Sequence, residues 1–131
     1  MDAMMNWLKE FPLWQGEALG VDTLSARPDS VGVFPQGQQV LWEKQTVLGD
    51  CIRRIRRRYF IRWQVSGREE AVRLLERFEA WVSQNRKTLP VFGDYQTLWT
   101  ENAHLLRTQN TGTGVYQLEL IVEYTSKLEG D

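Results

Sequence analysis

The stretch CIRRIRRRYFIRWQVSGREE, residues 51–70, decides the fold prediction. Its apolar and polar residues alternate, and successive side chains of a β-strand point to opposite faces of a sheet. The odd positions carry Ile55, Tyr59, Ile61, Trp63 and Val65. The even positions carry Arg54, Arg56, Arg58, Phe60, Arg62 and Gln64. We therefore expect a half-buried strand with one apolar face and one arginine-rich face.

A hairpin is predicted to place this strand beside residues 39–48. The dipeptide Gly49-Asp50 suits a two-residue turn with glycine at its first central position. We expect Arg57, which falls on the apolar face, to stack its guanidinium on Trp42. The predicted register pairs Leu48 with Cys51, Glu43 with Arg56, Trp42 with Arg57, and Val40 with Tyr59.

A helix is predicted directly after the strand. The sequence Ser66-Gly67-Arg68-Glu69 has the spacing of a capping box, in which the first and fourth residues cap each other's backbone amides. The helix is expected to run to about Asn85, because apolar residues recur every three or four positions. The apolar stripe consists of Ala71, Leu74 or Leu75, Phe78, Trp81 and Val82.

The remaining segments complete an α+β prediction. Residues 4–11 form a short amphipathic helix, SVGVF (30–34) forms a strand, and PQGQ (35–38) forms a turn. A connector, TLPVFGDYQT (88–97), leads to a second hairpin, WTENAHLLRTQ (99–109) and VYQLELIVEYT (115–125), in which His104 faces Leu120. We expect one domain over residues 1–131, with an antiparallel or mixed sheet, one long helix packed on it, and a short N-terminal helix. Residues 126–131 are expected to fray.

Composition indicates a globular chain. It has 131 residues, 42% apolar and 25% charged, with a net charge of −1 and a single cysteine. The charge argues against a dedicated nucleic-acid-binding domain, which is usually basic. No segment has the roughly 20 apolar residues of a membrane span, and the start lacks the pattern of a secretory signal. We expect a protein of a reducing cytoplasm that does not enter membranes.

Candidate catalytic residues are few. His104 is the only histidine and has no accompanying nucleophile pattern, so we interpret it as structural. Cys51 lies beside the arginine run, whose positive charge would lower the pKa of its thiol. The favoured interpretation is nevertheless that Cys51 is simply a small strand residue. The aspartates lack a metal-loop spacing. We expect no catalytic, cofactor or metal site.

The arginine-rich face is the main candidate for function. It is either a solvated strand face or a contact surface, and its charge suits an acidic protein surface. As a contact surface, Arg54, Arg56 and Arg58 would meet acidic residues such as Glu119 and Glu123 of another copy of the chain. Trp14 lies in the tryptophan-rich segment NWLKEFPLWQG, which belongs either to the core or to an arm on a neighbouring subunit. The candidate interface residues are Arg54, Arg56, Arg58, Arg62, Glu119, Glu123 and Trp14.

An ordered set of segments resembles a known family. The segments are FPLWQGEALGVDTL (11–24), SVGVFP (30–35), YFIRWQVSGREEAVRLLERFEAWV (59–82), LPVFGDYQTLW (89–99) and TGTGVYQLELIVEY (111–124). They resemble the small minor capsid proteins in tail-gene clusters of phages of Gram-positive bacteria. More distantly, they are similar to the tail terminator proteins of long-tailed phages.

This resemblance implies a structural protein and not an enzyme. Tail terminators form a ring, typically a hexamer, which caps the head-proximal end of the tail tube and offers a surface to the head. The implied partners are other copies of the chain, a tail tube or sheath protein, a head-completion protein and, transiently, DNA in the ring lumen. The implied location is the bacterial host cytoplasm during assembly, and then the virion or a headless tail-like particle.

Two other functions stay open at this point. A head-completion or connector protein would have a similar small ring-forming fold. A small nucleic-acid-binding domain would use the arginine strand with the aromatic residues Tyr59, Phe60 and Trp63 to hold single strands.

Overall fold

The fold is α+β, and the sheet is its larger part. The computed structural model describes residues 2–12, 20–21, 30–108 and 113–128. In chain order the elements are α1 (Asp2–Leu8), β1 (Gly20–Val21), β2 (Val31–Gln45), β3 (Cys51–Ser66), α2 (Arg68–Gln84), the 3-10 helix η2 (Arg86–Thr88), β4 (Asp94–Thr108) and β5 (Thr113–Leu128). The strand order is β1-β2-β3-β5-β4, with β1 parallel to β2 and the other neighbours antiparallel. The sheet is antiparallel apart from the two-residue strand β1, which agrees with the prediction of an antiparallel or mixed sheet.

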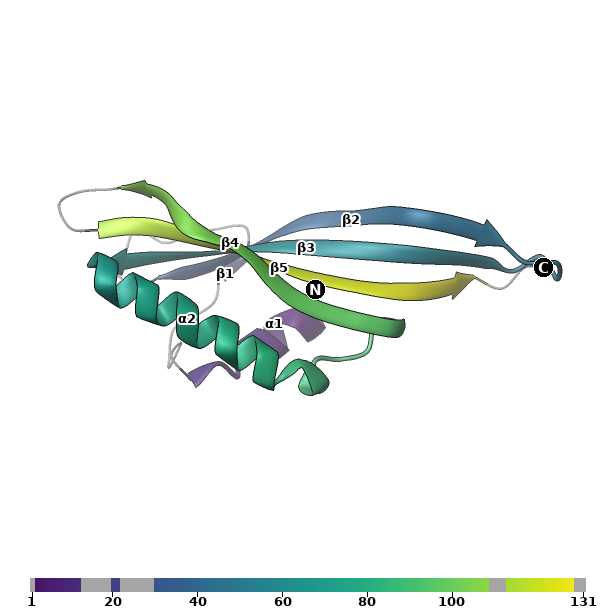
Figure 1. Cartoon of the computed structure of the whole chain (residues 1–131), viewed down its shortest axis with the longest axis horizontal. Helices are drawn as coiled ribbons and strands as arrows, with labels where there is room; N and C mark the ends of the chain where they lie inside the picture. Colours follow the sequence, from purple (N-terminus) through teal and green to yellow (C-terminus); the bar gives the residue numbers. More distant parts are fainter. Residues whose placement is uncertain (1, 13–19, 22–29, 109–112, 129–131) are drawn as a thin grey trace.

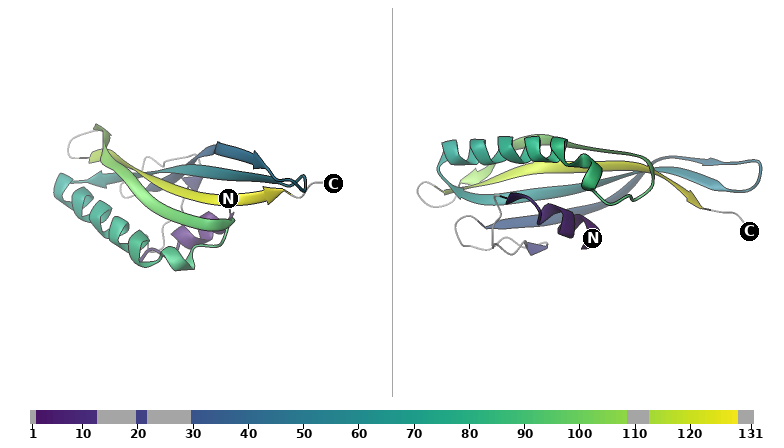
Figure 2. Two further views of the ribbon diagram at one scale, coloured as in Figure 1. Left: turned by 45° about the vertical axis from the view of Figure 1, so that its right-hand side comes forward. Right: turned by 90° about the horizontal axis from the view of Figure 1, so that it is seen from below.

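Both helices cover the same face of the sheet. Figure 1 shows α1 and α2 below one half of the long, twisted sheet, and the view from below in Figure 2 shows them side by side against it. The helices bury an aromatic cluster, in which Trp7 of α1 lies 4.7 Å from Trp81 of α2 and Phe78 lies 5.4 Å from Trp63 of β3, between ring centroids. The Trp7 indole donates a 2.9 Å hydrogen bond to the Thr88 hydroxyl.

The predicted apolar faces are confirmed for β3 and α2. The odd residues of β3 named above are all buried, with Tyr59, Ile61 and Trp63 at most 3% exposed. On α2 the buried residues are Ala71, Leu75, Phe78 and Val82, with Leu74 and Trp81 partly buried beside them. Burying this much apolar surface on one side of the sheet supplies most of the drive to fold.

The other half of the sheet extends past the helices as an arm. We define the arm as residues 39–45 of β2, 51–56 of β3 and 125–128 of β5, joined at its end by the loop 46–50. Figures 1 and 2 show that neither helix covers these residues. The helix-covered remainder is called the body.

The predicted register of the β2–β3 hairpin is wrong by about three residues. Gln45, not Leu48, pairs with Cys51, so the turn is the loop 46–50. The loop closes by a 2.8 Å bond from the Thr46 amide to the Asp50 carbonyl and a 3.1 Å bond from the Asp50 amide to the Thr46 hydroxyl. A threonine side chain thus favours a longer loop than the Gly-Asp dipeptide alone predicts. The observed pairs are Glu43 with Arg53, Trp42 with Arg54, and Val40 with Ile55.

Other local predictions also change. The segment PQGQ is not a turn but an irregular stretch inside the continuous strand β2. His104 pairs with Gln117 and not with Leu120, because β4 shifts its register between Glu101 and His104. Strand β5 continues to Leu128, so residues 126–128 do not fray; residues 129–131 lie outside the described part.

The predicted capping box is absent. Ser66 is the last residue of β3, and the helix begins after Gly67, whose φ of +91° suits glycine. No side chain caps the first turn of α2. Ser66 pairs with Thr113 in the β3–β5 ladder, and its hydroxyl lies 3.4 Å from the Thr113 hydroxyl, so it contacts the sheet and not the first turn of the helix.

Candidate functional site

The arginine face lies on the side of the sheet away from the helices. Its cations are Arg54, Arg56, Arg58 and Arg62 of β3, as predicted from the alternation, and Phe60 stands among them. All five side chains are partly buried. Strand β5 lies alongside and supplies the residues that most of these cations contact.

Glu123 of β5 compensates two of the arginines within the same chain. Its carboxylate lies 2.6 Å from an Arg56 Nη2 and accepts a 2.7 Å bond from Arg56 Nε, and Arg54 Nη2 lies 3.7 Å away. Arg54 also donates to the Tyr95 carbonyl at 2.9 Å and to the Thr125 hydroxyl at 3.1 Å. Because the Glu123 side chain is only 14% exposed, this pairing is well shielded from solvent. A contact of Glu123 with another subunit would have to compete with these bonds.

Arg62 is held by aromatic rings and an amide. Its guanidinium carbon lies 4.4 Å from the centroid of Phe34 and 5.8 Å from that of Phe60. Its Nε donates a 2.8 Å hydrogen bond to the Gln117 side-chain oxygen. Aromatic faces attract a guanidinium, so Arg62 belongs to a stacked network on the sheet surface.

Glu119 has a neighbour of like charge. It pairs across the ladder with Glu101 of β4 and accepts a hydrogen bond from the side chain of Asn102. Glu101 accepts a 2.7 Å bond from the Trp99 indole. Of the predicted interface residues, the structure thus brings Arg54, Arg56 and Glu123 together and leaves Glu119 in a separate acidic pair. Trp14 lies outside the described residues.

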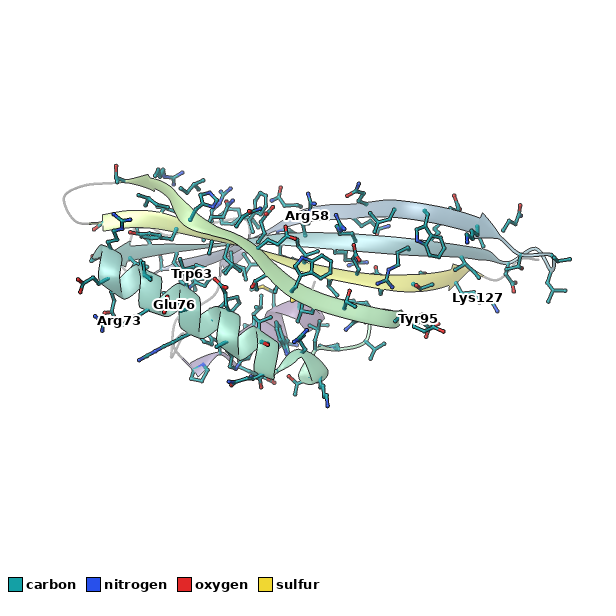
Figure 3. All side chains as sticks on the ribbon, viewed as in Figure 1. Arg58, Trp63, Arg73, Glu76, Tyr95 and Lys127 are labelled. Atoms are coloured by element: carbon teal, nitrogen blue, oxygen red, sulfur yellow. The ribbon has the colours of Figure 1, made fainter. Side chains whose placement is uncertain are left out.

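Arg58 differs from the other members of the arginine face. Its Nε atom is inaccessible to solvent, and among the described residues it has no hydrogen-bond partner. It lies opposite the irregular stretch of β2, where Gln36 and Gly37 interrupt the pairing. Figure 3 labels it near the middle of the sheet, where the helix-covered body meets the arm.

Arg57 lies on the helix side, as predicted, but with different partners. It stacks on Phe92 and Tyr124, with centroid distances of 5.6 and 5.7 Å, and not on Trp42. It donates a 2.9 Å bond to the Tyr124 hydroxyl. Burial opposes its charge, but hydrogen bonds with Tyr124 and Tyr59 outweigh this and raise its pKa. Burial has the opposite effect on Tyr59, whose pKa it raises because it disfavours the phenolate.

A lowered Cys51 pKa, the less favoured interpretation of this residue, is wrong. The Cys51 thiol donates a 2.7 Å hydrogen bond to Glu43, and this bond raises the thiol pKa, with burial adding to the effect. Hydrogen bonds from Cys51 and Arg53 lower the pKa of Glu43 in turn. A thiol that donates to a carboxylate is kept protonated, and a protonated thiol is a poor nucleophile.

The most exposed apolar side chains form a feature that the sequence analysis missed. Val47 and Leu48 lie at the end of the arm and are 104% and 86% exposed. Other apolar side chains are exposed as well. Two of them lie in the arm, Val40 and Trp42, and two lie in the body, Val91 and Tyr95. Two aliphatic residues in a loop between strands, TVLGD at 46–50, are the signal that could have pointed to them, since such loops are usually polar.

Known proteins give no further assignment. The chain matches no protein-family model and no curated protein. Within residues 2–12, 20–21, 30–108 and 113–128, no group of three or more histidine, cysteine, aspartate or glutamate side chains could hold a metal ion. None of the described helices is long and apolar enough to cross a membrane.

Proposed function

We propose that this chain is a structural subunit of a phage or prophage tail, which forms a ring on the head-proximal end of the tail tube. The ring ends polymerisation of the tube and offers a surface to the head. The resemblance described above motivates the proposal, and the arm supports it. The single observation that carries it is the exposed apolar end of the arm at Val47 and Leu48.

The arm is suited to contact a second copy of the chain. Apolar side chains exposed in a group usually mark a contact surface, because exposing them to water costs free energy. The arm projects from the body along the long axis of the molecule (Figure 1), so its end can reach a neighbouring subunit without moving the helices. A contact between different surfaces of identical subunits generates a ring when the rotation closes.

The long edge of β2 supports contact through side chains. Among the described residues, β1 covers this edge only at Gly32 and Val33, which leaves the edge from Phe34 onward without a partner strand. Irregular pairing at Pro35–Gln38 and Val40–Trp42, together with Lys44, hinders addition of another strand there. We therefore expect a neighbour to meet the exposed side chains of the arm and not to extend the sheet.

The first experiment tests self-assembly through the arm. The double variant Val47→Ser/Leu48→Ser removes the apolar end, and Val72→Ser on α2, where the valine is 44% exposed, is the matched control. In light scattering after gel filtration, the native chain and the control should form the oligomer, and the double variant should elute as a folded monomer. A native chain that stays monomeric at every concentration would exclude the ring.

The second experiment tests the position in the tail. Purified protein is mixed with tail tubes and imaged by negative-stain electron microscopy. The proposal expects rings, and a density at one end of the tube only. Rings that bind isolated heads or portals and ignore tubes would favour the head-completion or connector alternative.

The nucleic-acid alternative has a distinct signature. It expects retention of single-stranded oligonucleotides in a filter assay at low salt, with a steep loss as salt rises. The ion pairs of Arg54 and Arg56 with Glu123 reduce the positive charge available for such a strand. The ring proposal expects no retention by the isolated subunit.

A further inference from the structure

A break in the sheet ladder sets Arg58 apart from the other arginines. Pro35 pairs with Tyr59, and Gln38 pairs with Arg57, so that Gln36 and Gly37 together oppose Arg58. Such a bulge bends its strand and leaves backbone groups out of the ladder. Gly37 adopts a φ of +79°, and a side chain built on it would meet no atom within 4 Å. The bulge therefore leaves open space beside Arg58.

Two surface hollows share this space. One has a volume of about 310 Å³ and the other about 190 Å³. Both are lined by Gly37, Gln38 and Arg58; the larger adds Tyr59 and Arg57, and the smaller adds Phe60 and Arg56. Tyr59 and Phe60 lie on opposite faces of β3, so the hollows approach Arg58 from both sides. Neither hollow is lined by an aspartate or glutamate among the described residues.

Arg58 is the uncompensated cation in this part of β3. Arg53 pairs with Glu43 at 2.9 Å, and Arg54 and Arg56 pair with Glu123. Arg57 bonds the Tyr124 hydroxyl. In contrast, no hydrogen bond or ion pair of Arg58 with a described residue is present, and its Nε is cut off from water. Keeping a guanidinium partly buried without an anion is costly to folding.

We propose that this bulge is a carboxylate-binding site, in which Arg58 receives an aspartate or glutamate side chain from another protein chain. The planar guanidinium presents paired N–H donors that match the two oxygens of a carboxylate. Gln38 also lines both hollows, but its side-chain oxygen is engaged by Arg57 at 3.4 Å, so the proposal rests on Arg58 alone. The bulge makes room for the incoming group, and the open position at Gly37 keeps that room free.

A protein carboxylate fits better than a nucleic-acid backbone. Binding of a strand gains affinity from many phosphate contacts along a continuous basic surface. Here the cations on either side of Arg58 along the arginine face are engaged, Arg56 by Glu123 and Arg62 by Gln117 and two phenyl rings. Arg56 and Arg57 also line these hollows but bond Glu123 and Tyr124, so among the described lining residues Arg58 is the arginine left to bind a single carboxylate. This proposal for Arg58 does not depend on whether the chain forms a ring.

The test combines stability with binding of a defined probe. Blocked tripeptides Gly-Glu-Gly and Gly-Gln-Gly are added at tens of millimolar to the full chain, and the melting temperature is recorded. A ligand that binds only the folded state raises this temperature. We expect the glutamate peptide to raise it for the native chain and the glutamine peptide to leave it unchanged. Equal effects of the two peptides, or none, would overturn the proposal.

Substitutions assign the effect to Arg58. Arg58→Met removes the charge while keeping most of the volume, so without peptide it should raise the melting temperature and should abolish the response to the glutamate peptide. Arg58→Lys should retain a weakened response. Arg73→Met, at a 61% exposed arginine on α2, is the control and should keep the full response. A lower melting temperature for Arg58→Met, or a larger stabilisation of the native chain by an oligothymidylate than by the glutamate peptide, would contradict the site.

Discussion

The body and the arm are built from the same long strands but differ in what covers them. In the body, α1 and α2 bury one face of β3, and Tyr59, Ile61 and Trp63 are nearly inaccessible. In the arm, Cys51 through Arg54 of the same strand are all partly exposed, because no helix lies above them, and burial begins only at Ile55 where the arm joins the body. The alternating pattern is continuous through both regions. The second layer, and not the strand itself, decides which apolar residues become core.

This difference separates stability from recognition. Core packing concentrates the free energy of folding in the body, while the exposed apolar end of the arm contributes little to it. We expect substitutions of buried residues in the body to destabilise the folded chain. Substitutions in the arm should change assembly only.

The largest expected effect comes from the aromatic cluster of the body. Phe78 is fully buried and contacts Phe11 edge-on, with ring centroids 5.1 Å apart. Phe78→Ala should lower the free energy of unfolding by about 3–5 kcal/mol, because it leaves a cavity. Chemical denaturation measures this, and Val72→Ala on the exposed side of α2 is the control. A loss comparable to that of the control would mean that α2 does not pack as described.

An intermediate effect is expected at the junction of body and arm. Glu123→Gln leaves Arg54 and Arg56 without their carboxylate, and should lower the free energy of unfolding by about 2 kcal/mol. That value lies between the cost of breaking a buried pair and the small worth of an exposed one. Glu43→Gln, which breaks the exposed pair with Arg53 in the arm, is the comparison and should not change the denaturation midpoint. Equal effects would remove the distinction between the two regions.

A smaller effect depends on pH. The pKa of Tyr59 is raised above its usual 10.0 because burial disfavours the phenolate. Its contribution is fully present below pH 10.0 and is lost as pH rises through the folded-state pKa, since the unfolded chain ionises first. Tyr59→Phe should therefore flatten the fall in melting temperature between neutral and strongly alkaline pH. Tyr95→Phe, at an exposed tyrosine, should leave that fall unchanged.

The smallest effect on folding is expected at the end of the arm. Val47→Ser/Leu48→Ser removes two side chains that have almost no contact with the rest of the chain. The free energy of unfolding of the monomer should change by no more than about 0.5 kcal/mol, as for other exposed sites. A larger destabilisation, measured by denaturation at low protein concentration, would show that the arm contributes to the stability of the monomer.

Sequence patterns predicted the features that depend on residue alternation and on nearest neighbours. The faces of β3, the apolar stripe of α2 and the mixed α+β arrangement are confirmed. The hairpin register was wrong because the Thr46 side chain closes a longer loop than Gly49-Asp50 predicts. The capping box was wrong because Ser66 completes the β3 ladder. In the first case hydrogen bonds within the loop prevailed over the predicted two-residue turn, and in the second case strand pairing prevailed over the predicted helix cap.

The candidate site was also predicted only in part. The sequence identified the arginine face, but it did not show that Glu123 already compensates Arg54 and Arg56 within the chain. Nor did it distinguish Arg58, whose isolation depends on a bulge in a different strand. The contact of these residues with another subunit stays a prediction.

By itself, the order of residues determined which side chains share a face, because a strand and a helix impose fixed periods on their neighbours. Only the tertiary structure decided the register of the strands, the length of sheet that the helices leave uncovered, and the partner of each arginine. These depend on where separate segments meet in space. A one-residue change in pairing moves every side chain to a new neighbour, and the alternating pattern of β3 alone did not fix how far β2 slides along it.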